Sequence, residues 1–339
     1  MVQKNNFRKL INAMPKIELH LHLEGAFTLE SLFKLIEKYG GDPSINSIQD
    51  LEKKFIFKDF PHFIETWIWK NQFFKSPEDF EYTTYYTLKE LHQQNVLYTE
   101  VFYSPWDFAG NGLHAQEITK AHLSAVNRAK RDFGIQCKLI ADISRDVGWE
   151  NSVERFKQII SYRDQGVIGI GLGGSEQKFP NELYKHVFKL AKKNGFHIVA
   201  HAGEAAGAQS IWSALQVLQV ERIGHGVRAI EDAHLVDKLK ENQIPLEVCV
   251  TSNLKTRVFP SLKAHPIKFF FENGLAVNIN SDDPTMFGTT ITNEFLLLNE
   301  GLNFSLDDIK KLINNAVEAA FLAESEKDTL KRKVKKYWE

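Results

Sequence analysis

Eight short apolar runs with helix-like segments between them predict an α/β fold, a closed (β/α)8 TIM barrel. Strands that alternate with helices form parallel βαβ units, and eight such units in about 250 residues are the size of a barrel. A doubly wound open sheet is the alternative, but no Gly-x-Gly-x-x-Gly motif opens a first helix. We therefore expect a single barrel domain over residues 1–339.

The expected strands are rich in β-branched residues and lie at 17–23, 96–103, 136–143, 167–172, 196–201, 222–225, 245–249 and 276–280. Helix-like segments follow at 115–133, 151–165, 181–194, 208–218, 232–242 and 265–273. Several of them end in the glycine expected after a helix: Gly134, Gly166, Gly195 and Gly274. Residues 305–337 predict extra C-terminal helices, with Ser305 as an N-cap.

The stretch 28–91, after the first strand, is longer than one crossover helix needs. We expect a helical insertion there, because insertions after barrel strands commonly cover the active site. Its 55–80 part is rich in Phe and Trp, which as a group could enclose a flat ligand such as a nucleobase. Helix packing is the simpler interpretation for most of these rings, and whether the stretch moves as a lid stays open.

Composition narrows the class of protein. The net charge of -1 gives no electrostatic reason to expect nucleic acid or an anionic membrane as partner. Two cysteines, Cys137 and Cys249, are too few for a disulfide framework or a cysteine-based zinc site. The N-terminal segment lacks the apolar core of a signal peptide, and no apolar run approaches the ~20 residues of a membrane helix. We expect a cytoplasmic protein with a small-molecule substrate. The sequence does not predict its oligomeric state.

Polar and apolar residues alternate strictly through the first strand. Glu18, His20, His22 and Glu24 therefore share one face, because residues i and i+2 of a strand point to the same side. Two histidines at this spacing can reach one ion, and neutral imidazole is the commonest metal ligand. Such a pair alone is weak evidence, so its meaning depends on the other strand ends.

Potential ligands and acids follow several other expected strands. They are His201 at the end of the fifth strand with Glu204 just beyond it, His225 at the end of the sixth, and Asp282 and Asp283 after the eighth. A barrel places its active site at these C-terminal strand ends. Three imidazoles (His20, His22, His201) and the Asp282 carboxylate suit Zn²⁺, which lowers the pKa of a bound water to roughly 7.

The remaining polar residues suggest roles around such an ion. Glu204 is the natural proton carrier, because burial raises the pKa of a carboxyl group until it can donate a proton. His225 could orient or deprotonate the water, and Asp283 could exchange one hydrogen bond with substrate. Gly173 and Gly174 remove side chains where a ligand must approach backbone N–H groups.

These residues resemble the adenosine deaminase branch of the amidohydrolase superfamily. The motifs that carry the resemblance are Met-Pro-Lys-Ile-Glu-Leu-His-Leu-His-Leu-Glu-Gly (14–25), Gly-Gly-Ser-Glu (173–176), His-Ala-Gly-Glu (201–204), Arg-Ile-Gly-His-Gly (222–226), Thr-Ser-Asn-Leu (251–254) and Asn-Ser-Asp-Asp-Pro (280–284). They occur in the order of that family and extend over nearly the whole chain.

The resemblance implies the hydrolysis of adenosine or 2′-deoxyadenosine to the 6-oxo purine nucleoside (inosine, from adenosine) and ammonia. It implies one Zn²⁺ per subunit, held by His20, His22, His201 and Asp282. It further implies that Glu204 protonates the ring nitrogen beside the reacting carbon. His225 and Asp282 would activate and orient the attacking hydroxide. The substrate-binding residues that it implies are His22, Glu24, Gly174 through its backbone N–H, and Asp283.

Two departures from the family pattern leave the substrate open. Many adenosine deaminases carry Asp where this chain has Glu24, and Glu resembles the adenine deaminase relatives. The usual pattern also has Asp where this chain has Gly171, so that a contact is missing or replaced. Free adenine and a 5′-modified adenosine such as 6-aminodeoxyfutalosine are therefore alternative substrates. A catalytically inactive nucleoside-binding relative is a further, weaker alternative.

Overall fold

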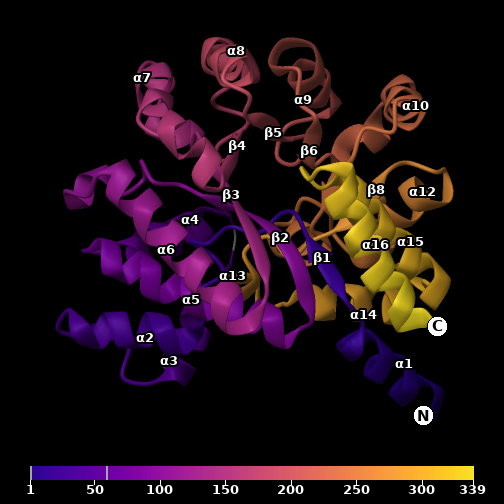
Figure 1. Ribbon diagram of the computed structural model, residues 1–339, viewed down its shortest axis with the longest axis horizontal. Helices are drawn as coiled ribbons and strands as arrows, with labels where there is room; N and C mark the ends of the chain where they lie inside the picture. The colour runs from indigo at the N-terminus through magenta and orange to yellow at the C-terminus, as the bar shows by residue number, and fades with distance from the viewer. Residues whose placement is uncertain (1, 59) are drawn as a thin grey trace.

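The computed structural model, which describes residues 2–58 and 60–339, contains one eight-stranded parallel sheet (Figure 1). Its strands are β1 (Lys16–Glu18), β2 (Val96–Tyr103), β3 (Gln136–Asp142), β4 (Val167–Gly171), β5 (His197–Ala202), β6 (Arg222–His225), β7 (Leu246–Val248) and β8 (Val277–Ile279). Each strand pairs with the next along the chain. A parallel bridge between Leu21 and Asp282 brings the end of β1 beside the end of β8. The predicted (β/α)8 barrel is confirmed.

The first strand is shorter than the 17–23 that we expected. Regular pairing stops at Glu18, and only isolated bridges at Leu21 and His22 continue it. The side chain of Asn280 explains the change, because its Oδ1 accepts the backbone N–H groups of Leu19 at 2.8 Å and His20 at 3.1 Å. The Asn280 side chain thus replaces the backbone hydrogen bonds between strands at Leu19 and His20, where the chain enters the mouth of the barrel.

Helices surround the sheet (Figure 1). They are α1 (Val2–Ala13), α2 (Leu29–Lys38), α3 (Ile48–Lys54), α4 (Phe60–Asn71), α5 (Pro77–Gln93), α6 (Ala115–Phe133), α7 (Ser152–Lys157), α8 (Lys185–Lys193), α9 (Ala208–Ser213), α10 (Ala233–Glu241), α11 (Val250–Lys255), α12 (Ile267–Glu272), α13 (Pro284–Phe287), α14 (Ile291–Leu302), α15 (Leu306–Ala319) and α16 (Glu324–Trp338). No helix in the described part of the chain is long and apolar enough to cross a membrane.

Two helices that we expected to be continuous change type along their length. The 151–165 segment is α-helical only in α7 and ends as a 3-10 turn from Ile160 to Gln165. Side chains three residues apart eclipse in a 3-10 turn, and Ile159 and Tyr162 are both buried there. The 208–218 segment begins as α9 and continues as a π-helical turn from Ala214 to Leu218. Apolar spacing alone does not distinguish these helix types.

The 28–91 stretch consists of four helices, α2 to α5. The last of them, α5, leads into β2 and packs against α6, so it serves as the first outer helix of the barrel. The other three form the additional layer. Phe63, on α4, stacks on Phe287 of α13 with ring centroids 5.3 Å apart. Because α13 follows the last strand, this contact joins the additional layer to the barrel mouth.

The C-terminal helices pack on the opposite side of the strands from that layer (Figure 1). Ser305 forms the predicted N-cap of α15, in a capping box with Asp308. Helix α15 contacts β8 and β1, and its last turn offers the Ala319 carbonyl to Arg222 at 2.9 Å. Within the barrel, Arg222 pairs with Glu100 and with Glu247, each at 2.6 Å. Arg222 thus makes structural ion pairs inside the barrel.

Candidate active site and metal centre

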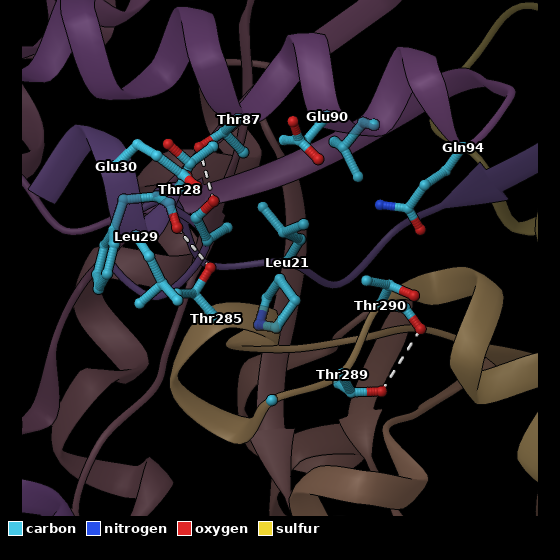
Figure 2. Close-up of a pocket in the computed structure, with 15 residues that line it drawn as sticks. Leu21, Thr28, Leu29, Glu30, Thr87, Glu90, Gln94, Thr285, Thr289 and Thr290 are labelled. Carbon is cyan, nitrogen blue, oxygen red and sulfur yellow. Dashed lines mark hydrogen bonds between the residues drawn. The ribbon is translucent and has the colours of Figure 1, made fainter. Parts of the chain in front are cut away.

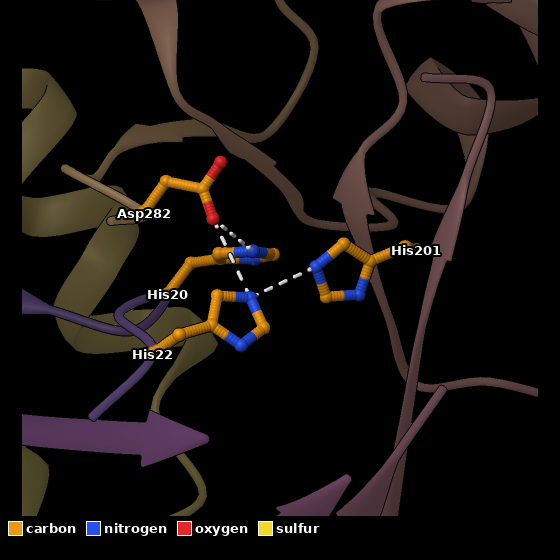
Figure 3. Close-up of side chains that lie close together, drawn as sticks. All are labelled: His20, His22, His201 and Asp282. Carbon is orange, nitrogen blue, oxygen red and sulfur yellow. Dashed lines mark hydrogen bonds and ion pairs between the residues drawn. The ribbon is translucent and has the colours of Figure 1, made fainter. Parts of the chain in front are cut away.

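Four side chains from three separate parts of the chain meet at the barrel mouth. His20, His22, His201 and Asp282 each offer a ligand atom, and these atoms all lie within 4.8 Å of one another. The Asp282 carboxylate Oδ1 is 3.5 Å from His20 Nε2 and 3.4 Å from His22 Nε2 (Figure 3). All four residues are buried. The structure brings together the ligand set expected from the strand ends.

The backbone around this cluster is unusually constrained. Asp282 and His225 have φ angles of +64° and +60°, a left-handed region in which residues with a side chain are uncommon. Asp282 is held there by two backbone bonds to the first strand: its N–H donates to the His20 carbonyl at 3.0 Å, and its carbonyl accepts the His22 N–H at 2.9 Å. Such conformations persist only where surrounding contacts over-determine them, and they cluster at functional sites.

Hydrogen bonds leave the histidine nitrogens ready for a cation. His20 Nδ1–H donates a hydrogen bond to the Glu247 carboxylate at 2.8 Å, which directs Nε2 toward the cluster. That Nε2 atom is buried without a hydrogen-bond partner among the described residues. His22 Nε2 is 3.1 Å from His201 Nε2.

Two neutral imidazole lone pairs cannot face each other at that distance without a proton or a cation between them. Burial lowers the pKa of His22 to about 3 and the pKa of His201 well below its ordinary value. Although burial favours its neutral form, neighbouring histidines hold the pKa of Asp282 well below its usual range. Although burial opposes the shift, hydrogen bonds to Asp282 and Glu247 raise the pKa of His20 to about 10, so His20 carries an extra proton when no cation is bound. Once a cation displaces that proton, three imidazole nitrogens and one carboxylate fit a divalent ion such as Zn²⁺.

Glu204 faces the cluster from the loop after β5. Its Oε2 lies 3.6 Å from His225 Nε2. Burial, and then the charges of Asp282 and Glu176, raises the pKa of Glu204 to about 8. The carboxyl group is therefore largely protonated at neutral pH and can give up a proton. Glu176 holds this loop in place, because its carboxylate accepts the N–H groups of Gly203 at 2.6 Å and Glu204 at 3.2 Å.

A chain of hydrogen bonds fixes the tautomer of His225. The Ile267 N–H donates to His265 Nδ1, so His265 carries its proton on Nε2 and donates to Asn253 Oδ1 at 3.0 Å. The Asn253 amide then donates to His225 Nδ1 at 3.2 Å. Burial lowers the pKa of His225 to about 4, so the ring is neutral near pH 7. Its one proton therefore sits on Nε2, directed toward Glu204 and Asp282.

The residues expected to bind substrate also lie at this mouth. Asp283 is buried, its Oδ1 has no hydrogen-bond partner in the described part of the chain, and burial raises its pKa well above the ordinary value. A Cβ atom at Gly25 would lie 1.8 Å from Asp283 Oδ1, so only glycine leaves room for this carboxyl group. Glu24 accepts the Ser104 N–H at 2.7 Å. Gly174 follows β4 with a φ of +93°, a conformation that favours glycine.

Sequence patterns did not single out Glu247, Asn253 or Lys70. Glu247 lies between two apolar residues of a short buried strand, and a charged residue there signals a buried partner. Asn253 falls inside the Thr-Ser-Asn-Leu motif without a role attached to it. Lys70 of α4 is fully buried beside the Trp67 ring, 3.7 Å from its centroid. Nothing local to α4 marks that lysine as inward-facing.

A separate cavity of about 330 Å³ is lined by Leu21 and by residues of α5 and of the segment around α13 (Figure 2). Leu21 lines it, and Leu21 alternates with His20 and His22, so its side chain points away from theirs. The hydroxyl groups of Thr87 and Thr285, which also line it, donate to the carbonyls of Ala26 and Phe27. The cavity is thus a space between α5 and the α13 region, and the metal ligands do not line it.

Comparisons with known proteins identify the family of this chain. The family model for adenosine deaminase matches residues 15–337. The adenine deaminase of Crocosphaera subtropica is 36% identical over 323 residues, which is 95% of this chain and 99% of that protein. The adenine deaminase of Vibrio parahaemolyticus is 34% identical over 327 residues, covering 96% and 97%.

Two solved structures of related enzymes have the same fold as this chain. The adenine deaminase of Arthrobacter aurescens superposes with a TM-score of 0.91 at 31% identity, covering 96% of this chain and 99% of that one. An amidohydrolase from Burkhoderia ambifaria, solved with bound Zn, superposes with a TM-score of 0.89 at 25% identity and covers 97% and 92%.

Proposed function

Because this chain belongs to the adenosine deaminase family, we propose that it hydrolyses free adenine to hypoxanthine and ammonia. Members of the family are hydrolytic deaminases of the amidine C–N bond in a purine ring. The observation that carries the choice of substrate is the full-length similarity to adenine deaminases, at 34–36% identity. It supports the alternative, free adenine, better than the adenosine or 2′-deoxyadenosine that we expected first.

Buried groups at the mouth also support a compact substrate. Glu24, only 2% exposed, already gives one carboxylate oxygen to the Ser104 N–H at 2.7 Å. Lys70 brings α4 over the same region, and Glu24 and Asp283 attract its ammonium group. The stacking of Phe63 on Phe287 closes α4 against α13. A covered mouth favours a free base over a nucleoside with its added ribose.

We assign the metal centre to His20, His22, His201 and Asp282, with Zn²⁺ as the ion. When bound there, such an ion supplies the Lewis acidity that makes hydroxide available near neutral pH. The chain's own residues prepare the site: Glu247 fixes the His20 tautomer, and Asn280 fixes the backbone on which His20 lies. The burial of all four side chains keeps bulk water away from them.

Three further side chains act on the purine. Glu204, protonated at neutral pH, donates its proton to N1 and so makes the adjacent C6 more electrophilic. His225 donates a hydrogen bond from Nε2 into the space between Glu204 and Asp282, where it orients the attacking oxygen. Burial and the charge of Asp282 raise the pKa of Asp283, which favours its protonated form, and in that form the carboxyl group donates a hydrogen bond to N7. The oxygen of water bonds to C6, and the C6 amine takes up one proton of that water and leaves as ammonia, which gives the 6-oxo base.

Product analysis tests this proposal. Purified, zinc-loaded protein is incubated separately with adenine, adenosine and 6-aminodeoxyfutalosine, and chromatography of the bases is combined with an ammonia assay. We expect hypoxanthine and ammonia in equal amounts from adenine. Release of ammonia only from adenosine or from 6-aminodeoxyfutalosine would contradict the proposal, and release from none of them would favour an inactive relative.

A further inference from the structure

Polar groups around the barrel mouth occur in the same cyclic order as the nitrogens of a purine. The strands follow one another from β1 to β8. Glu204 follows β5, Gly174 follows β4, Asp142 ends β3, and Asp283 follows β8. Around the edge of a purine, starting beside C6, the nitrogens are N1, N3, N9 and N7. If Glu204 meets N1 and Asp283 meets N7, then Gly174 faces N3 and Asp142 faces N9.

Asp142 has the geometry of a ligand-binding group. It is 4% exposed, and its Oδ1 atom is buried without a hydrogen-bond partner among the residues that the structure describes. Burial, followed by the charges of Asp107 and Glu24, raises the pKa of Asp142 to about 7, while a backbone hydrogen bond from Gly173 opposes the rise. A buried acceptor without a hydrogen-bond partner is destabilising, and a donor on the substrate would satisfy it.

Two glycines make room for this carboxyl group. A Cβ atom at Gly171 would lie 2.9 Å from Asp142 Oδ1 and 2.8 Å from the Phe102 ring. A Cβ atom at Gly173 would lie 2.9 Å from Asp142 Oδ2. Gly171 is one of the two positions at which the sequence departs from the usual adenosine deaminase pattern. The departure therefore gives space to a carboxylate that arrives from the neighbouring strand.

We infer that Asp142 selects the free base by accepting a hydrogen bond from N9–H of the purine. N3 and N9 flank C4, so an N–H donor at Gly174 and an acceptor at Asp142 match the N3/N9–H edge of adenine. A nucleoside has no hydrogen on N9 and carries a sugar there. A site built to bond an N–H group rejects the analogue that lacks it, because its own buried group is left unpaired. This inference rests on the proposed adenine deaminase activity.

The test compares adenine with 9-methyladenine in wild-type protein and in the Asp142→Asn variant, which keeps the side-chain volume. In the variant the amide oxygen serves the Gly173 N–H and the NH₂ group faces N9–H. We expect kcat/KM for adenine to fall by about 100-fold, while kcat/KM for 9-methyladenine changes less than about threefold. The preference for adenine thus shrinks by at least about 30-fold. An equal fall for both substrates, or no fall for adenine, would overturn the inference.

Two further variants make the result specific. Asp146→Asn removes a charge from the same segment, but Asp146 is already bonded to the Ser175 N–H at 2.8 Å, so we expect both substrates to change by the same factor. Glu24→Gln tests the neighbouring carboxylate, and a collapse of the preference in Glu24→Gln but not in Asp142→Asn would overturn the role of Asp142. If wild-type protein does not deaminate adenine at all, the proposed function fails, a result distinct from these.

Discussion

The Nδ1 atom of His20 lies 2.8 Å from Oε2 of Glu247, and both side chains are fully buried. Glu247 is in turn held by Arg222, which also bonds Glu100. A carboxylate that orients a metal-ligating histidine is a recurrent partner of such ligands. The relationship connects the ion-pair network inside the barrel with the proposed metal centre.

Loss of this carboxylate should weaken metal binding. We expect Glu247→Gln to lower Zn²⁺ affinity by about 10- to 100-fold, because the His20 tautomer and ring orientation are no longer enforced. Competition with a chelating indicator measures the affinity. Glu221→Gln is the matched control, since Glu221 is a half-exposed carboxylate that bonds His197, which is not a proposed ligand. Unchanged affinity in Glu247→Gln would contradict the expected role.

Glu204 is expected to act in the chemical step without holding the metal. Glu204→Gln keeps the size of the side chain but cannot deliver a proton to N1. We expect kcat to fall at least about 10³-fold, toward the upper part of the range for removal of a general acid. The metal content, measured by elemental analysis, should stay at that of wild-type protein. A variant that retains a tenth of the wild-type rate would exclude Glu204 as the proton donor.

Asn253 is a positioning residue for His225. In Asn253→Asp both side-chain oxygens accept, so we expect the His225 proton to move from Nε2 to Nδ1. The expected result is a fall in kcat of about 100-fold with KM changed less than about threefold, because the lost group acts on the attacking oxygen.

Nitrogen NMR of labelled histidine in Asn253→Asp reports the tautomer directly. Ser252→Ala, at the adjacent buried residue, is the control and should keep the wild-type tautomer. An unchanged His225 tautomer in Asn253→Asp would remove the basis of this prediction.

His122, a buried residue of α6 that is not a proposed ligand, should make stability depend on pH. It is 2% exposed, with Nδ1 at 2.7 Å from Thr84 Oγ1, and burial lowers its pKa to about 3. In the unfolded chain the ring takes up a proton near pH 6.5. Between these values the unfolded state binds more protons, so the free energy of unfolding falls as the pH falls.

Urea denaturation at pH 7 and pH 5 measures the His122 contribution. We expect about 2 kcal/mol of the loss between these pH values to come from this residue, and to disappear in His122→Gln. His186→Gln, which changes an exposed histidine of α8, should leave the loss as in wild-type protein. A loss of the same size in His122→Gln would show that other groups cause it.

The barrel and the ligand cluster could be predicted from the sequence because each strand and each ligand is marked by a short pattern of neighbouring residues. His20 and His22 belong to one alternating strand, and His201, His225 and Asp282 each follow an apolar run. Barrel topology then brings such strand ends together, so motifs that lie far apart in the sequence can be combined into one site.

The supporting residues could not be predicted in the same way. Glu247 is 227 positions from His20, so no local pattern relates them. The role of Asp142 depends on Gly171, at the end of the neighbouring strand, and on Gly173 just beyond it. Only the structure shows that these two glycines leave the space that the Asp142 carboxyl group fills. The substrate depends on such contacts, and the sequence pattern alone favoured adenosine first. The full-length relatives supplied the support for adenine.

The central claim is that this deaminase acts on the free base. The most direct measurement is kcat/KM for adenine and for adenosine, determined by ammonia release on the same zinc-loaded preparation. We predict that the value for adenine exceeds that for adenosine by at least about 10³-fold. A value for adenosine equal to or above that for adenine would contradict the claim.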